Sequence, residues 1–142
     1  MAVWFETSTS FDKMMENGVV KRVTEKNLFD ALSFAEAESR TIEELTPYIS
    51  GEFTVKAAKR TKISEIFFNS SADKFYLVNV AFATLDEKTG AEKESVSQIL
   101  VQASDFGSAV AAFKEGMKGT LADWEIKSVA ETPYMDVYPV KS

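Results

Sequence analysis

The segment from Leu28 to Phe67, LFDALSFAEAESRTIEELTPYISGEFTVKAAKRTKISEIF, has a second version further along the chain. That second version runs from Leu100 to Tyr138 and reads LVQASDFGSAVAAFKEGMKGTLADWEIKSVAETPYMDVY. Four apolar positions match at a constant offset of 72 residues: Leu28, Ala31, Phe34 and Ala37 correspond to Leu100, Ala103, Phe106 and Ala109. The sequence therefore predicts one structural unit used twice, in a single domain made of the repeats 1–70 and 71–142.

Each repeat begins with a pattern typical of a β-hairpin. From Val3 to Phe11 apolar and polar residues alternate, and Asn17-Gly18 then offers the positive backbone dihedrals of a tight turn. A return strand follows near Val19 to Leu28. The second repeat has the same pattern: a strand through Tyr76, Val78, Val80 and Phe82, a turn over Asp86 to Gly90, and a strand through Val96, Gln98 and Leu100. We therefore expect a hairpin at the start of both repeats.

A helix is expected after each hairpin. Ser33 and Glu36 have the spacing of a capping box, and Asp105 is in position to cap the second helix. Apolar stripes at helical spacing follow both caps, so we expect them to face the core. The stripes are Phe34, Ala37, Thr41 and Leu45 in the first helix and Phe106, Ala109, Phe113 and Met117 in the second. The residues expected to end the helices are Pro47 and Gly51 for the first, and Gly116 and Gly119 for the second.

A long strand closes each repeat. The two segments, Phe53 to Phe67 and Trp124 to Tyr138, exceed the usual strand length, so we expect bends near Lys59 to Lys62 and near Pro133. Each repeat is then strand, strand, helix, long strand. The predicted fold is an α+β domain with one curved antiparallel sheet, two helices and an approximate two-fold axis. Its topology loosely resembles the single-stranded nucleic-acid binders of the PUR-repeat and Whirly kind.

Composition excludes several kinds of chemistry. The 142-residue chain contains no cysteine and no histidine, which removes thiol nucleophiles, histidine-based catalytic pairs, and thiolate or imidazole metal ligands. Acidic residues lie in short runs without the spacing of a calcium loop. We therefore expect a non-enzymatic protein with no catalytic residues, no metal site and no cofactor. The N-terminal residues lack a secretory pattern, and no apolar run is long enough to span a membrane, so we expect a cytoplasmic protein.

Several unusual words in the sequence resemble one family. They are DALSFAEAE, TPYISGEFTV, LDEKTGAEK, LVQASD, EGMKGTLADW and ETPYMDVYP, and together they span nearly the whole chain. They are similar to an uncharacterised domain-of-unknown-function family found in Bacteroides-type bacteria and crAss-like phages. The resemblance implies a bacterial or phage cytoplasmic protein, and it brings no known catalytic residues with it.

Aromatic residues on the outer side of the first strands are candidate binding groups. If Phe5 faces the helix, alternation turns Trp4 to the opposite face, and Phe75 takes the equivalent place in the second repeat. Exposed there, Trp4 and Phe75, or the neighbouring Tyr76, would stack on unpaired bases. The alternative is that a loop, a partner subunit or a second small core covers these rings.

A basic stretch lies in the middle of the first long strand. Lys56, Lys59, Arg60 and Lys62 occur there without any acid, although the formal net charge of the chain is −6. On a regular strand Lys56, Arg60 and Lys62 would share one side and could follow a phosphate backbone. The alternative is a lysine-protected sheet edge. The matching stretch of the second repeat contains Glu131 and no cation beyond Lys127, so a phosphate site would lie on one repeat only.

The leading hypothesis is a protein that binds single-stranded nucleic acid through these cations and aromatics. A second hypothesis is a protein-interaction module that forms a homodimer or docks on a phage or host protein. The third is a small-ligand sponge used in phage counter-defence, with its pocket between the repeats or across a dimer axis.

Overall fold

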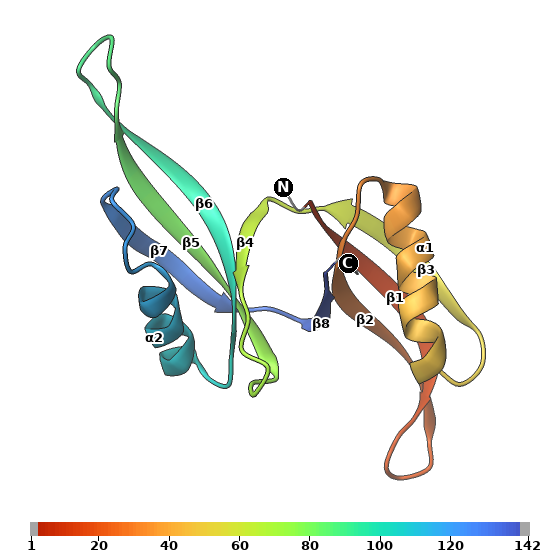
Figure 1. The fold of residues 1–142 in the computed structure, drawn as a ribbon. Helices are drawn as coiled ribbons and strands as arrows, with labels where there is room; N and C mark the ends of the chain where they lie inside the picture. Colours follow the sequence, from red (N-terminus) through yellow and green to blue (C-terminus); the bar gives the residue numbers. More distant parts are fainter. Residues whose placement is uncertain (1–2, 140–142) are drawn as a thin grey trace. The chain divides into compact units, whose positions relative to one another are not determined.

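A computed structural model describes residues 3–139 and divides the chain into two compact units. Unit 1 comprises Met1–Thr61 with Pro133–Ser142, and unit 2 comprises Lys62–Thr132. The elements of unit 1 are β1 (Trp4–Met14), β2 (Val20–Asp30), α1 (Phe34–Leu45), the short 3-10 helix η1 (Thr46–Tyr48), β3 (Phe53–Arg60) and β8 (Tyr134–Tyr138). Those of unit 2 are β4 (Ile63–Phe67), β5 (Lys74–Leu85), β6 (Glu92–Ala103), α2 (Phe106–Gly116) and β7 (Trp124–Glu131). Each unit is therefore an α+β structure with one α-helix (Figure 1).

The strands form two four-stranded sheets, so the prediction of one continuous curved sheet is wrong. Strand order is β3-β1-β2-β8 in unit 1 and β4-β6-β5-β7 in unit 2. Both sheets are antiparallel except at one edge, where β8 runs parallel to β2 and β4 runs parallel to β6. The second order, read in reverse, is β7-β5-β6-β4. Strands β3, β1, β2 and β8 therefore correspond in position to β7, β5, β6 and β4.

Each predicted long strand is split into two strands that join different sheets. The breaks fall at Thr61–Lys62 and at Thr132–Pro133, where the sequence predicted bends. After the first break β4 pairs with β6 of unit 2, and after the second β8 pairs with β2 of unit 1. Neither half of the sequence contains a complete sheet, because each sheet takes its parallel edge strand from the other half.

Matching irregularities occur at equivalent places in the two units. Opposite Ser8 and Thr9, strand β3 holds one extra residue, Lys56, which forms a β-bulge. Strand β7 has the same bulge at Lys127, opposite Asn79 and Val80. Just after each of these strands a threonine hydroxyl donates to a carbonyl of the first strand, as follows: Thr61 to Trp4 at 2.8 Å and Thr132 to Phe75 at 2.9 Å.

The helices pack on one face of each sheet through part of their apolar stripes. Ala37, Thr41 and Leu45 of α1 are buried, and the Thr41 hydroxyl donates to that of Thr7 on β1 at 3.0 Å. In unit 2 one buried cluster comprises Val78, Val80, Ile99, Val101, Phe113 and Met117, and a second comprises Tyr76, Ala103 and Ala109. The first residue of each stripe was wrongly expected in the core, since Phe34 is 56% exposed and Phe106 54% exposed. The first turn of each helix lies at the rim of its core.

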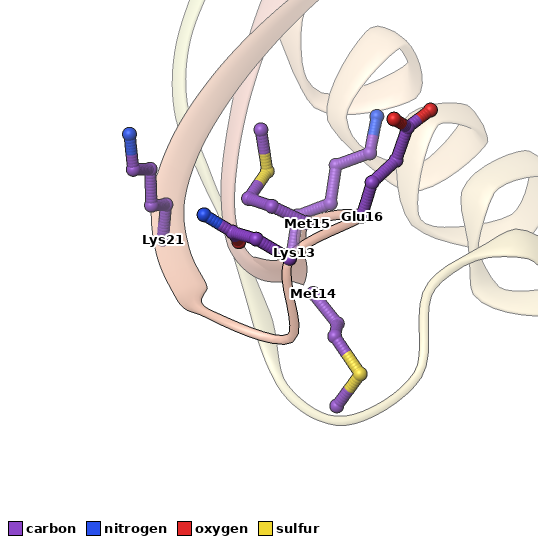
Figure 2. A pocket seen from close by; sticks show the side chains of 6 residues that line it. Lys13, Met14, Met15, Glu16 and Lys21 are labelled. Atoms are coloured by element: carbon purple, nitrogen blue, oxygen red, sulfur yellow. The ribbon is translucent and has the colours of Figure 1, made fainter.

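Turn and cap chemistry follows the sequence closely. The Ser33 side chain accepts from the Glu36 amide, and the Asp105 carboxylate accepts from the Ser108 amide at 2.7 Å, so both predicted N-caps are confirmed. In the first hairpin only Gly18 has a positive φ, because the amide of Met15 donates to the carbonyl of Val19 and three residues, rather than two, lie inside this pair. Figure 2 shows Met14 and Met15 pointing away from each other at this hairpin tip.

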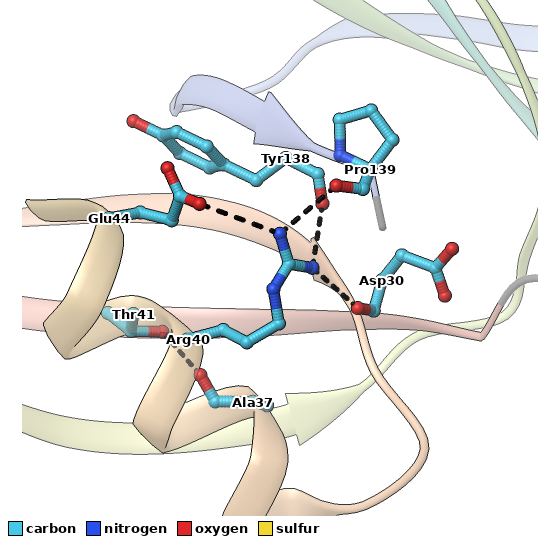
Figure 3. A network of polar contacts seen from close by, with 7 residues as sticks. All are labelled: Asp30, Ala37, Arg40, Thr41, Glu44, Tyr138 and Pro139. Carbon is cyan, nitrogen blue, oxygen red and sulfur yellow. Dashed lines mark hydrogen bonds and ion pairs between the residues drawn. The ribbon is translucent and has the colours of Figure 1, made fainter. Parts of the chain in front are cut away.

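Arg40 of α1 fastens strand β8 to the sheet of unit 1 (Figure 3). Its guanidinium donates to the carbonyl oxygens of Asp30 at 2.7 Å, Tyr138 at 3.3 Å and Pro139 at 3.0 Å. The same group lies over the Phe29 ring at 5.6 Å, and that ring stacks on Tyr138 with centroids 4.6 Å apart. One cation therefore satisfies backbone carbonyls at the ends of both β2 and β8.

Unit 2 holds its fourth strand by apolar packing instead. Ala112 takes the place of Arg40, and Phe67 at the end of β4 packs against Phe113 with centroids 6.1 Å apart. Gly116 allows this approach, because a Cβ added there would lie 2.5 Å from the Phe67 ring. Gly116 is the last helical residue of α2, and the described glycines with positive φ do not include it. Its role is therefore to make room for Phe67, whereas Gly119 has the positive φ expected after a helix.

We predict that Gly116→Ala destabilises the protein by about 1–3 kcal/mol, because the new methyl group displaces a packed aromatic ring. Gly107→Ala on the same helix is the matched control, since an added Cβ would meet its nearest atom at an ordinary 3.6 Å. This control is expected to be neutral or slightly stabilising through higher helix propensity. Urea unfolding of the two variants measures the difference, and equal midpoints would contradict the proposed role of Gly116.

We also predict that Arg40→Ala loosens β8 and lowers the free energy of unfolding by about 2–3 kcal/mol, as expected for lost charge-assisted hydrogen bonds. Arg40→Lys should not restore it, because one ammonium cannot reproduce the fork of guanidinium donors. Arg22→Ala, which breaks an exposed ion pair with Asp12, should cost less than about 1 kcal/mol. Amide hydrogen exchange in β8 reports the loosening directly. Unchanged protection of the β8 amides in Arg40→Ala would disprove the clamp.

Candidate functional site

The aromatic residues proposed as stacking groups are buried. Trp4 is 6% exposed, Phe75 2% and Tyr76 3%. Trp4 and Phe75 do point away from the helices, as alternation predicted, because their neighbours Phe5 and Tyr76 contact Phe34 and Phe106 on the helix side. A buried ring presents no free face to a base, so the placement of these three residues gives the stacking prediction no support, and the burial of Trp4 and Phe75 agrees with the alternative that these rings are covered. Alternation fixes which face a side chain takes, but not whether that face is covered.

The basic stretch is exposed, although its geometry differs from the prediction. Lys56, Lys59 and Arg60 lie on β3, which is an edge strand, and all three are exposed. Lys62 is exposed too, but it lies in the break after β3 and is the first residue of unit 2. The bulge at Lys56 and this break interrupt the regular alternation, so the prediction of one strand with these cations on a shared side is wrong.

The cations on β3 carry charge that the protein does not neutralise. Within the part of the chain that the structure describes, Lys56, Lys59, Arg60 and Lys62 form no ion pair. Strand β3 also contains no acid. Unit 1 therefore presents three free positive charges along one edge of a protein whose net charge is negative.

The equivalent edge of unit 2 is neutralised. Lys127, which occupies the matching bulge, lies 3.4 Å from Glu125 and 3.5 Å from Glu94. The carboxylates of Glu125 and then Glu94 raise the pKa of Lys127 by stabilising its charged form. Register places Thr54 and Arg22 of unit 1 where these two acids stand in unit 2. The difference between the two edges therefore comes from a few substitutions on the same backbone.

A hollow of about 510 Å³ lies between β3 and the start of α1. Its lining combines an exposed aromatic ring, a carboxylate, a lysine and small apolar residues: Phe34, Ala35 and Glu38 from the helix, and Val55, Lys56, Ala57 and Ala58 from the strand. Sequence reasoning missed this site because periodicity assigned Phe34 to the core. The available signal was its position directly after the cap residue Ser33, where a helix has only begun.

A second hollow of about 530 Å³ lies at the tip of the first hairpin (Figure 2). Met14 is 71% exposed and Met15 37% exposed, and Lys13, Glu16 and Lys21 also line the hollow. Methionine side chains adapt to varied apolar partners. The neighbouring charges have both signs, and Lys13 lies 4.0 Å from Glu25. This tip is therefore better suited to an apolar partner than to a polyanion.

Among residues 3–139 there is no group of three or more acidic side chains placed to hold a metal ion. Over the same described range, neither helix has the length and hydropathy that crossing a bilayer requires.

The chain belongs to the family described as domain of unknown function DUF4494, which it matches over residues 3–140. No curated protein and no solved structure matches the chain.

Proposed function

We propose that this protein is a non-enzymatic binding protein and that its ligand is single-stranded nucleic acid, held along β3 of unit 1. The observation that carries the proposal is the set of three exposed cations on that strand, none with an ion-pair partner. A phosphate backbone supplies the missing negative charge and releases counterions when it binds. The binding region is one strand wide, about 26 Å long at the usual rise per residue, and it suits one extended polymer rather than a wide duplex.

We infer that the two units are diverged copies of one ancestral unit. The common element order, the bulges at Lys56 and Lys127, and the hydroxyl contacts of Thr61 and Thr132 support this. We include in this proposal the loose topological likeness to PUR-repeat and Whirly proteins. It supports the proposal only as an example of single-stranded nucleic-acid binders with a similar topology. We place the activity in the bacterial cytoplasm, in the setting of Bacteroides-type bacteria and their crAss-like phages, because the sequence resemblance implies it.

Charge limits the strength expected of the interaction. Three neutralised phosphates on a single strand give a slope of about −2 in a plot of log K against log salt concentration. The overall negative charge of the protein repels nucleic acid at longer range, and this repulsion weakens as salt screens it. Because counterion release makes the phosphate contacts weaker as salt rises, binding is still expected at low ionic strength, and the net negative charge keeps it in the micromolar range or weaker.

A second candidate function is docking on a protein partner, or on a second copy of the chain, through the hairpin tip. The observation in its favour is the exposed apolar group there: Met14 at 71%, Met15 at 37%, Val19 at 48% and Val20 at 56% exposure. Such patches are uncommon on isolated monomers and often mark interaction sites.

We predict that Lys56→Gln/Lys59→Gln lowers affinity for a fluorescent single-stranded oligonucleotide about tenfold and reduces the salt slope by about 1.4. The matched control is Lys114→Gln/Lys127→Gln, which removes the same charge from unit 2, including the equivalent bulge lysine, and should change affinity less than about threefold. Fluorescence anisotropy over a salt series measures both quantities. An equal loss in the two double variants, or no binding by the parent protein at low salt, would rule the proposal out.

A further inference from the structure

The hollow between α1 and β3 brings an aromatic ring next to the free cations. Phe34 is 56% exposed, yet its ring is held edge-on against the buried Phe5 ring, with centroids 5.1 Å apart and planes at 74°. This contact restrains Phe34 while more than half of its surface stays open. A restrained, exposed ring is a good stacking surface, because little conformational entropy is lost when a flat ligand packs on it.

Two charged groups line the same hollow. Lys56 stands at the β-bulge and is followed along the strand by Lys59 and Arg60. Glu38 lines the helix side. A carboxylate accepts hydrogen bonds from exocyclic amino groups of bases, whereas a lysine binds phosphate. The hollow therefore contains one group suited to each part of a nucleotide: ring, base edge and phosphate.

Unit 2 has the equivalent aromatic ring but lacks the carboxylate and the unpaired lysine. Phe106 is 54% exposed and lies edge-on to Tyr76, with centroids 6.1 Å apart and planes at 88°. Val110 takes the position that Glu38 has in unit 1. The bulge lysine Lys127 forms ion pairs with two carboxylates. The aromatic ring, the carboxylate and the unpaired lysine are therefore present together in unit 1 but not in unit 2. Substitutions in unit 2 can serve as matched controls for those in unit 1.

We propose that this hollow receives one unpaired base of the bound strand, stacked on Phe34, with its amino group donating to Glu38 and its phosphate on Lys56. This inference rests on the proposed function and specifies it further. A base in a duplex cannot enter, because its edge is paired and its faces are stacked. Bases with an exocyclic amino group, such as cytosine and adenine, are preferred over thymine and uracil, which would place a carbonyl oxygen against the carboxylate.

The stacking arm of the test compares Phe34→Ala with Phe106→Ala, two equivalent and equally exposed rings. Anisotropy is measured with fluorescent single-stranded oligo-dC, oligo-dA and oligo-dT, with the corresponding RNA strands, and with a blunt duplex. Phe34→Ala is expected to weaken binding of single-stranded oligo-dC about tenfold, and Phe106→Ala less than twofold. The parent protein should bind single strands of mixed sequence at least fivefold more tightly than the duplex.

The base-edge arm uses Glu38→Val, which copies the residue at the equivalent place in unit 2. This change removes a negative charge, so it should strengthen binding of oligo-dT while removing the preference for oligo-dC and oligo-dA. A general loss of folding would instead weaken all ligands together. Cytidine monophosphate, added as a competitor, shows whether a lone nucleotide suffices. We expect it to compete at least a hundredfold more weakly than the strand, because Lys56 is the one cation of β3 that its phosphate contacts.

The results separate the two proposals. If Lys56→Gln/Lys59→Gln weakens binding while Phe34→Ala and Phe106→Ala behave alike, the base hollow is wrong and the cationic strand stands. Equal affinity for duplex and single strand would overturn the proposal that the hollow receives an unpaired base. Equal displacement of the strand by an acidic peptide from the parent and Phe34→Ala proteins would overturn it as well. If the parent protein binds no oligonucleotide at low salt, both proposals fail.

Discussion

The structure depends on the pairing of β8 with β2 and of β4 with β6. In each case the short parallel strand covers a strand that would otherwise be the edge of a three-stranded sheet. An uncovered edge leaves backbone amides and carbonyls without partners, and it invites pairing with other chains. The protein meets this requirement in two ways, since Arg40 binds the backbone at the end of β8 and Phe67 at the end of β4 packs into the core beside Gly116.

The two units show how the same backbone can have different surface chemistry. Strands β3 and β7 share their length, bulge position and edge location, and both are largely exposed. Their charges differ because β7 has Ala130 and Glu131 where β3 has Lys59 and Arg60, and because Glu94 and Glu125 pair with Lys127. The residues of each strand account for most of this difference, and Glu94 adds a contribution from a neighbouring strand.

Local features of the fold could be predicted from the sequence, and pairing between distant segments could not. Ser33 and Asp105 cap their helices, and the strands break beside Thr61 and Pro133, because these effects act over a few residues. The partners of β4 and β8 depend on segments far away in sequence, which periodicity does not encode. For the candidate site, the exposed position of Lys56, Lys59 and Arg60 on an edge strand agrees with the alternative of a lysine-protected sheet edge, and the binding of nucleic acid there stays a prediction. Phe34 was expected in the core but is exposed, and Trp4, for which exposure and covering were both considered, is covered, because alternation and helical spacing give a direction and not a depth.

The exchange of end strands also has a consequence for protein synthesis. Strands β1, β2 and β3 leave the ribosome early, but β8 follows every other described element, so the sheet of unit 1 stays unfinished until translation has passed β7. During that interval β2 is an open edge next to a growing chain. Unit 2 has no such delay, because β4 is synthesised before β5 and β6 and is available to pair with β6 as soon as that strand emerges. The nascent chain is therefore expected to complete its second unit first, and the first unit remains dependent on β8, which is made after the other described strands.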